Sequence, residues 1–349
     1  MKIAIITDQH FGARKNSKLF HDFFLKFYND VFFPTLVREG ITTVVDMGDT
    51  FDSRKGIDFS ALSWAKDNYY DTLQKMGIVV HTIVGNHTAY YKNTNNINAV
   101  DLLLREYDNV TVYSEPTEVQ LGNLKTLFIP WINEENEKTT FNLIKKTTCK
   151  CAMGHLELAG FAANRQCIME HGYDRKLLEK FSLVLSGHYH TRSNQENIFY
   201  IGNPYEIYWN DVDDQRGFII FDTDTLEITY IDNPYNIFYN ICYEDTNHQT
   251  FNFSLYEDKI VKLIVKENTN KKQFEKFVDK LYSANVADLK VIENYNFDGW
   301  YSKDSIDDLE SENTLSILNT YIRESEHNLD KNLLSEIIKE IYQESCEMI

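Results

Sequence analysis

The chain has 349 residues, of which 43% are hydrophobic, and this is enough for one large domain and a smaller one. Its net charge of −18 argues against a protein that coats nucleic acid generally, because such proteins are normally basic. The sequence has no run of about 18 apolar residues, so we expect no membrane span.

Strand-like apolar runs that end in polar residues recur through the first part of the chain. Several are nearly continuous and rich in β-branched residues, as expected of strands buried on both faces. The first run reaches Asp8 with no small-residue cleavage site after it, so it predicts a strand and not a signal peptide. In chain order the runs are 2–7, 42–47, 78–84, 124–130, 149–153 and 182–186.

Helix-like stretches separate the early runs, at about 17–38, 59–76 and 97–106. Pro34 is expected to kink or end the first of them. The alternation of strand and helix predicts a layered α/β domain. After Ser193 the pattern changes to short strands and turns, which predicts a second sheet packed on the first.

The character of the sequence changes again near Asn233-Pro234. Residues 235–297 mix strands with one helix at about 271–283, which suits a small α/β accessory domain. An acidic linker follows at 298–312, and two amphipathic helices finish the chain. Residues 300–349 contain 12 acidic and 4 basic side chains, so this tail carries a net charge of −8.

Five of the strand-like runs are followed by residues of the kinds that bind metals. Sheets of this kind present ligands at the carboxyl ends of their strands, and glycine there lets the backbone turn sharply. Each signal is weak alone, but the ordered set is specific: 14 glycines and 10 histidines predict fewer than one Gly-His pair, and two occur. The motifs are Asp8-Gln9-His10, Gly48-Asp49, Gly85-Asn86-His87, Gly154-His155 and Gly187-His188-Tyr189-His190.

These residue types suit a pair of divalent cations. Two cations about 3.5–4 Å apart need a bridging carboxylate with nitrogen and oxygen ligands around each. Mixed imidazole and carboxylate ligands favour manganese, iron or zinc, and manganese where carboxylate, carbonyl and water oxygens contribute. Such a pair clamps a phosphate and lowers the pKa of a bound water without a covalent intermediate. The sequence therefore predicts a two-metal phosphoesterase.

In this order, the motifs resemble those of the calcineurin-like metallophosphoesterase superfamily, which implies a two-sheet αββα sandwich. Residues 49–55, 81–87, 129–131 and 154–158 are similar to the SbcD-type nucleases of DNA double-strand-break repair, and most similar to the recombination endonuclease subunits of T-even-like phages. The resemblance covers about residues 1–230, and beyond them it rests on architecture alone.

The resemblance implies two Mn²⁺ ions, with Mg²⁺ or other divalent ions able to replace them in vitro. Asp49 would bridge both ions. The ligands of the first ion would be Asp8, His10, Asp49 and His190. The ligands of the second would be Asp49, Asn86, His155 and His188.

His87 matches the family histidine that contacts the scissile phosphate and supports the leaving group, so it is the predicted catalytic residue. Thr88 departs from the family, which normally has Asp or Glu there. A carboxylate at that position can orient the ring and favour its charged form, and threonine cannot. Asp52 is a candidate to supply this charge from a neighbouring loop.

Basic residues gather in loops that follow the motifs. A local basic rim could hold a phosphate backbone despite the negative total charge, and ordinary solvated loop charge is the alternative. Tyr90 and Tyr91 could stack on DNA, although most of the aromatic residues are expected in the core. The candidate DNA-binding residues are Arg14, Lys15, Arg54, Lys55, Lys92 and Arg192.

Four segments follow from these patterns: a nuclease domain at 1–232, an accessory or cap domain at 233–297, the acidic linker at 298–312 and a helical tail at 313–349. Short helices are marginal alone in water, and an apolar stripe without an internal partner indicates helix recognition by another protein. The alternative is that both tail helices dock on the nuclease domain. The candidate partner-binding residues are Leu318, Ile322, Leu333, Ile337 and Ile341.

The resemblance implies DNA as the substrate, a coiled-coil ABC-type ATPase as the partner, and a homodimer of this chain within a heterotetramer. It also implies 3′-to-5′ trimming of duplex DNA together with single-strand endonuclease activity. The five cysteines are odd in number and lack CxxC spacing, which favours free thiols in a cytoplasmic protein, the host cytoplasm if a phage encodes it.

Two other functions are compatible with the motifs. A phosphatase or nucleotide phosphodiesterase of the same superfamily would use the same metals but would not need the long C-terminal extension. A catalytically weakened scaffold would explain Thr88, but the full set of metal ligands argues against it.

Overall fold

The computed structural model describes residues 1–164, 167–266 and 270–293, together with positions 322, 331, 333, 334, 337 and 338. The chain divides into two compact units, Met1–Glu293 and Asn294–Ile349, and the elements below belong to the first. None of the helices in the described residues is long and apolar enough to cross a membrane.

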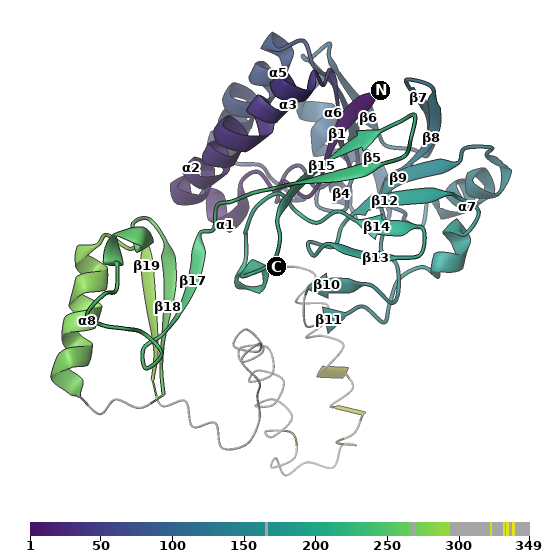
Figure 1. The fold of residues 1–349 in the computed structure, drawn as a ribbon. Coiled ribbons are helices and arrows are strands. Elements are labelled where there is room, and N and C mark those ends of the chain that lie inside the picture. The colour runs from purple at the N-terminus through teal and green to yellow at the C-terminus, as the bar shows by residue number, and fades with distance from the viewer. Residues whose placement is uncertain are drawn as a thin grey trace. The chain divides into compact units, whose positions relative to one another are not determined.

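Two six-stranded sheets form the centre of the fold (Figure 1). The first has the order β16-β15-β1-β2-β3-β6, in which β15 runs antiparallel to β1 and to β16 while β1, β2, β3 and β6 are parallel. Its strands are β1 (Lys2–Ile6), β2 (Thr43–Asp46), β3 (Val79–Ile83), β6 (Val110–Tyr113), β15 (Gly217–Asp222) and β16 (Ile228–Asp232).

The second sheet has the order β13-β14-β12-β9-β8-β7. Its four central strands are parallel, and an antiparallel strand closes each edge. Its strands are β7 (Thr117–Leu121), β8 (Leu124–Ile129), β9 (Cys151–His155), β12 (Leu183–Gly187), β13 (Ser193–Gln195) and β14 (Ile198–Tyr200).

This division corrects the expected composition of the second sheet. We expected the strands after Ser193 to form it, but β15 and β16 return to the first sheet, and β8, β9 and β12 make up the middle of the second. The strands of both sheets are mainly buried on both faces, so their sequences look alike. The local pattern of a buried strand does not indicate which strand it pairs with.

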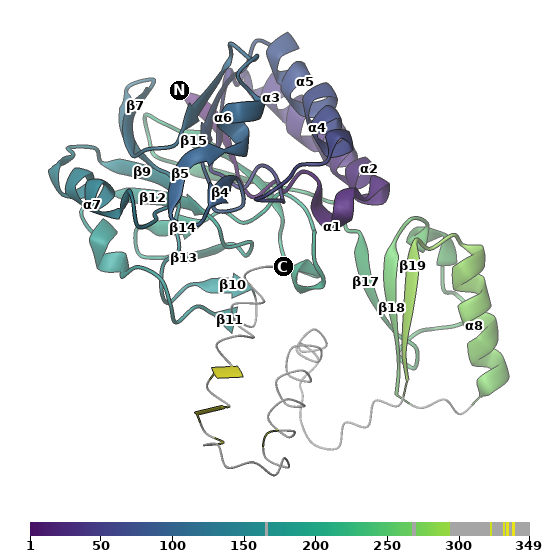
Figure 2. The same cartoon turned by 180° about the vertical axis from the view of Figure 1, so that it is seen from behind.

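Three apolar layers hold the two sheets and their helices together. Ile3 and Ile5 of β1 pack between the sheets, whereas Ala4 and Ile6 face the helices on the other side. A third cluster fills the space between the second sheet and α7. The predicted αββα sandwich is therefore confirmed, with α2 to α5 together on one outer face (Figure 2). The helices are α2 (Lys18–Phe27), α3 (Phe33–Glu39), α4 (Phe59–Ala65), α5 (Asp71–Lys75), α6 (Ala99–Leu103) and α7 (Glu137–Lys146).

Two of the predicted helices contain a π-helical turn, η1 (Tyr28–Phe32) between α2 and α3 and η2 (Lys66–Tyr70) between α4 and α5. Pro34 was expected to kink or end the first helix. The helix does not end there, since it continues to Glu39, and Pro34 lies in the first turn of α3 directly after the wider turn η1. This is the position where proline is tolerated, because the N–H that it lacks belongs to the start of a new helical segment.

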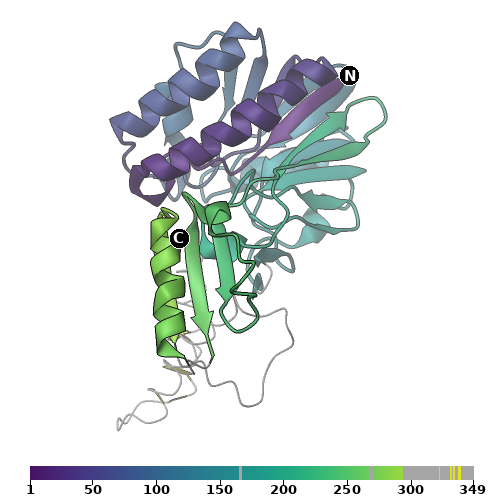
Figure 3. The same cartoon turned by 60° about the vertical axis from the view of Figure 1, so that its left-hand side comes forward.

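The segment expected to be an accessory domain has a parallel sheet of its own, in the order β17-β18-β19 (Figure 3). Helix α8 covers one face of this sheet, and a separate apolar cluster lies between them. The elements are β17 (Phe238–Cys242), β18 (Ile260–Val265), α8 (Lys271–Ser283) and β19 (Asp288–Glu293). The remaining short elements are α1 (Ala13–Asn16), β4 (Ala89–Tyr91), β5 (Thr94–Asn98), β10 (Ala162–Asn164), β11 (Cys167–Ile168), η3 (Arg175–Leu178), η4 (Trp209–Asp211) and η5 (Phe253–Tyr256).

Candidate metal centre

The loops after β1 and β2 run side by side beyond the ends of their strands. The amide of Asp8 donates to the carbonyl of Gly48, and the amide of His10 donates to the carbonyl of Asp49, each at 2.9 Å. The carbonyl of Phe11 in turn accepts from the amide of Asp52 at 3.1 Å. These bonds continue the parallel pairing of the sheet into the loops, so the residues of the first two motifs are held against each other.

The first group of potential ligands contains Asp8, His10 and His190, whose ligand atoms all lie within 4.8 Å of one another. The Nε2 atoms of the two histidines are 3.2 Å apart. His10 Nδ1 lies 3.1 Å from the carboxylate of Asp52, which can accept its proton and leave the lone pair on Nε2. This is the tautomer that a metal-binding histidine needs.

The second group contains Asp49, His155 and His188, again with ligand atoms within 4.8 Å. The Oδ1 atom of Asn86 belongs with them, since it lies 2.9 Å from His155 Nε2 and 3.1 Å from His188 Nδ1. His155 Nδ1 donates to the carbonyl of Met47 at 2.9 Å, so Nε2 is the nitrogen that remains for a metal once its proton is displaced.

All seven predicted ligands thus lie in two adjacent groups drawn from both sheets. Carboxylate oxygens, an amide oxygen and imidazole nitrogens are the donor set that first-row divalent cations take, so the residues present fit the expected metals. Asp49 lies in the second group, where its Oδ2 is 3.1 Å from His155 Nε2. Its role as the bridge between two ions stays a prediction.

Four of the candidate ligands have a backbone conformation that is rare for residues other than glycine. The φ angles are 52° at Asp8, 47° at His10, 49° at Asp49 and 89° at His188. A left-handed conformation costs roughly 1–2 kcal/mol for each such residue and persists only where the surroundings enforce it. Strain of this kind at four candidate ligands is typical of a functional site.

The glycines of the motifs serve mainly for close approach. We expected them to allow sharp turns, and this holds for Gly48, whose φ is 111°. Gly85 and Gly187 do not have positive φ angles. A Cβ atom on Gly85 would lie 2.2 Å from Asp49 Oδ1, and one on Gly187 would lie 2.0 Å from Thr7 Oγ1. A larger residue would push the neighbouring strand ends apart.

His87 lies half-buried beside both groups. Its amide donates to Asp49 Oδ1 at 2.8 Å, and its ring is 4.9 Å from the ring of His10. Its Nδ1 donates to the main-chain carbonyl of Asp52 at 2.8 Å, which leaves Nε2 for contact with a substrate. His87 is therefore positioned by backbone groups next to the candidate ligands.

Thr88 has a local structural role. Its buried hydroxyl accepts from the amide of Gly85 and donates to the carbonyl of the same residue, each at 3.1 Å. The Asp52 carboxylate lies within 4.8 Å of the ring nitrogens of His10 and His87, but its hydrogen bond goes to His10. The orientation of the His87 ring thus comes from the Asp52 carbonyl.

Burial and the neighbouring charges together shift the pKa values of the histidines in different directions. Burial and the neighbouring His155 lower the pKa of His188 to about 3. Burial opposes the charge of His155 as well, but the Asp49 carboxylate outweighs it and raises the pKa of His155 to about 9. The pKa of Asp49 is depressed despite its burial, because His155 and His87 are close.

Of the predicted DNA-binding residues, two are held by contacts within the fold and four are exposed. Arg54 donates from Nε to the carbonyl of Asn86 at 2.9 Å, and Arg192 pairs with Asp232 at 2.5 Å, so both have structural partners. The exposed side chains are those of Arg14, Lys15, Lys55 and Lys92, and the tyrosines at 90 and 91 are exposed as well.

Arg216 has a role at this site that the motifs did not indicate. Its buried guanidinium donates to the carbonyl of His190 and to Asn203, and it pairs with Asp211 and Asp214 at 3.2 and 3.0 Å. A buried arginine between two carboxylates in a loop has no local sequence signature. A sequence feature that could have pointed to this region is the Gly-Asn-Pro turn at 202–204, because Asn203 contacts both Arg216 and, at 3.4 Å, His190 Nδ1.

An α/β sandwich that gathers carboxylates and histidines at its strand ends is the arrangement of a metallophosphoesterase. The chain belongs to the calcineurin-like phosphoesterase family, whose model matches residues 1–192. It is similar to Exonuclease subunit 1 of Enterobacteria phage T4, with 31% identity over 313 residues, or 89% of each chain. These similarities confirm the resemblance that the motifs indicated.

Solved structures with lower similarity include an archaeal phosphodiesterase and a dimetal phosphatase from Danio rerio. The first has 13% identity and a TM-score of 0.33 over 67% of this chain and 100% of that one. The second has 12% identity and a TM-score of 0.38 over 63% of this chain and 91% of that one.

The raised pKa of His155 predicts that metal binding depends on pH. Below about pH 9 its ring carries a proton that a cation must displace, since a ligating nitrogen is unprotonated. Affinity for a cation in the second group should therefore fall about tenfold for each pH unit below that value, if one proton leaves for each ion. Calorimetric Mn²⁺ titrations at pH 6.5, 7.5 and 8.5 measure this slope. Equal affinity at all three values would contradict it.

Proposed function

We propose that this chain is the Mn²⁺-dependent DNA nuclease subunit of a complex that acts in double-strand-break repair or recombination. The single observation that carries the proposal is the pair of adjacent ligand groups at the strand ends, with His87 beside both. The similarity to a phage exonuclease subunit over most of the chain supports DNA as the substrate. Duplex trimming from 3′ to 5′ and single-strand endonuclease activity are the corresponding proposals for its products.

Each part of the site would have a separate task. Two bound cations would clamp the scissile phosphodiester and activate a water molecule as the nucleophile. With both ring nitrogens protonated, His87 would donate a hydrogen bond from Nε2 to the phosphate as charge builds up on the leaving oxygen. Exposed Lys15, Lys55 and Lys92 would hold the flanking phosphates.

The domain division at 1–232, 233–297, 298–312 and 313–349 is part of this proposal. In the tail, Ile322 is helical and buried, whereas Leu333 and Ile337 are helical and more than two-fifths exposed. Leu318 and Ile341 lie outside the described residues. A coiled-coil ABC-type ATPase would bind this tail, and two copies of the chain would take part in the assembly.

The Asp49→Ala variant tests the metal requirement. It should lose bound Mn²⁺ and cleave labelled duplex DNA at background rate, because Asp49 is the carboxylate proposed to bridge both ions. Metal analysis and a DNA cleavage assay measure the two effects, and the control is Asp279→Ala, an exposed carboxylate on α8. A variant that still binds two equivalents would rule out the bridge. Wild-type chain that cleaves a small phosphodiester but not DNA would favour the phosphodiesterase alternative.

The His87→Ser variant separates chemistry from binding. Cleavage should fall by about 10²–10³-fold, because the variant removes a donor aimed at developing charge. Mn²⁺ and DNA affinities should stay near those of the wild type, since His87 lies outside both ligand groups as proposed. Exposed His171→Ser is the matched control. Loss of metal from the His87 variant would instead make it a ligand.

Truncation after Gly299 tests the partner surface. The shortened chain should keep its melting temperature and its Mn²⁺-dependent cleavage of short DNA, because the ligand groups lie in the unit that ends at Glu293. It should no longer co-purify with the ATPase or gain rate from ATP. Unfolding of the truncated chain, or full ATPase affinity, would show that the tail serves the fold or that partner binding lies elsewhere.

A further inference from the structure

Gln9 lies between two proposed ligands of the same cation, yet its own side chain points away into the core. It is completely buried, and Asp8 and His10 flank it. Its Nε2 donates to the carboxylate of Asp46 at 2.9 Å, and its Oε1 accepts from the hydroxyl of Tyr28 at 2.6 Å. Both ends of the amide are therefore bonded to side chains that bind no metal in the proposed site.

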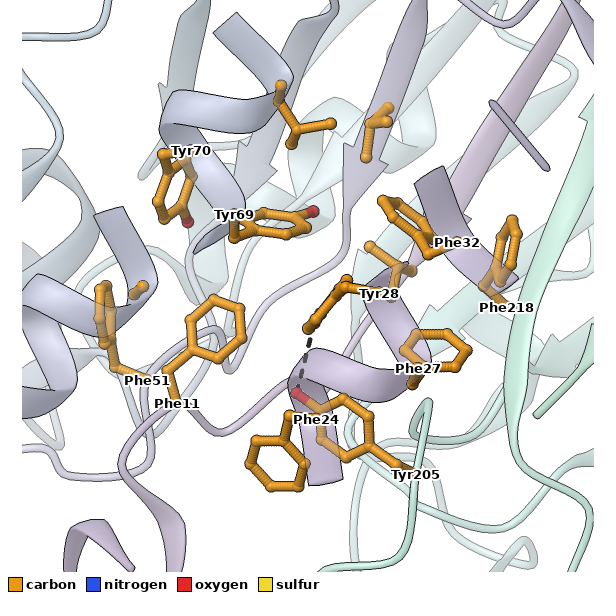
Figure 4. Close-up of a cluster of buried hydrophobic side chains, with 14 of the residues drawn as sticks. Phe11, Phe24, Phe27, Tyr28, Phe32, Phe51, Tyr69, Tyr70, Tyr205 and Phe218 are labelled. Atoms are coloured by element: carbon orange, nitrogen blue, oxygen red, sulfur yellow. Dashed lines mark hydrogen bonds between the residues drawn. The ribbon is translucent and has the colours of Figure 1, made fainter. Parts of the chain in front are cut away.

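The groups around Gln9 are themselves fixed. The hydroxyl of Tyr205 donates to the main-chain carbonyl of Gln9 at 2.7 Å. The same hydroxyl lies 3.3 Å from that of Tyr28 (Figure 4). The ring of Tyr205 stacks on Phe24 at 3.8 Å. The carboxylate of Asp46 also accepts from Thr50 at 2.5 Å and from the amide of Gly48 at 3.1 Å.

This network explains how the backbone of the first motif is held in an unfavourable conformation. Asp8 and His10 both have positive φ angles, so the two residues on either side of Gln9 are strained. A buried hydrogen bond stabilises the fold, and a buried polar group that loses its partner destabilises it further. The three bonds to Gln9 therefore oppose the strain at both of its neighbours.

The hydroxyl that reaches Gln9 belongs to the residue that opens the π-helical turn η1. Tyr28 is its first residue and is fully buried, as are Phe27 before it and Phe32 at its end. The wider turn inserts a residue relative to a regular helix and so changes which side chains face the sheet. Turns of this kind are frequent at functional sites.

We infer that Gln9 is a positioning residue that holds Asp8 and His10 in ligand geometry, with Tyr28, Tyr205 and Asp46 as its supports. The inference rests on the proposed metal site and names residues that set the affinity of its first ligand group. An apolar side chain at position 9 would fill the same space in the core but would release the loop. The second ligand group, which Gln9 does not contact, would keep its affinity.

Two variants break side-chain bonds of the network without removing a ligand, namely Gln9→Leu and Tyr28→Phe. The matched control is Tyr107→Phe, which deletes a tyrosine hydroxyl from the same apolar cluster but breaks a 2.7 Å bond to Asp71. Calorimetric titration of full-length protein with Mn²⁺ resolves the affinities of the two ions, and thermal melts without metal report stability.

Both network variants should weaken one Mn²⁺ equivalent by about 10–100-fold, the usual effect of losing a group that orients a ligand, and leave the other within about twofold. Excess Mn²⁺ should restore their cleavage rate. The double variant should be no worse than Gln9→Leu alone, because both changes break one chain of bonds. Tyr107→Phe should lose stability but bind both ions like the wild type.

Network variants that lose stability as the control does, yet bind both ions normally, would overturn the inference and make the network part of the core alone. Equal weakening of both ions would also overturn it, because the effect would then not pass through Asp8 and His10. Wild-type chain that binds no divalent cation would instead refute the proposed function itself.

Discussion

The structure depends on placing two buried carboxylates, Asp8 and Asp49, beside four histidines at the carboxyl ends of strands from two sheets. Like charges in a buried site repel one another, and each loses the solvation that water would provide. Asp8 shows this effect directly, since burial raises its pKa. Nearby imidazoles offset part of that cost, and divalent cations in the same place would offset more of it.

The two-sheet arrangement is what makes this concentration of charge possible. The first sheet contributes the loops after β1, β2 and β3, and the second contributes those after β9 and β12. The strand ends approach so closely that Gly85 and Gly187 have no room for a Cβ atom. Backbone hydrogen bonds between the first two loops and the buried contacts of Gln9 then hold residues whose backbone is strained.

The sequence predicted much of this site because its residues sit at strand ends in a fixed order. Asp8, His155 and His190 were identified from short motifs, and the structure brings each of them into a ligand group. The predicted boundaries of the buried strands and of α8 were also close to those observed. Hydrophobic periodicity and the residues that end a helix or strand are local features of the sequence.

What the sequence did not predict depends on contacts between distant residues. The assignment of β15 to the first sheet is set by its pairing with β1, more than 200 positions away. The role of Arg216 depends on two carboxylates and a carbonyl that meet it only in the folded chain. Asp52 was a candidate to supply charge to His87; its carbonyl accepts from that ring, and its carboxylate lies nearby but bonds to His10.

The π-helical turn η1 also has a consequence for how this helix tolerates change. A regular helix repeats its buried face every 3.6 residues, and the wider turn shifts that repeat by about one residue. Phe20, Phe24 and Phe27 follow one frame, and Phe32 and Leu36 follow the next. Deleting one residue between the two groups would let Phe32 and Leu36 follow the same regular repeat as Phe27, without the wider turn. Adding a residue would instead rotate one apolar face by about 100° toward solvent. The packing of this helix therefore resists an added residue more strongly than a deleted one.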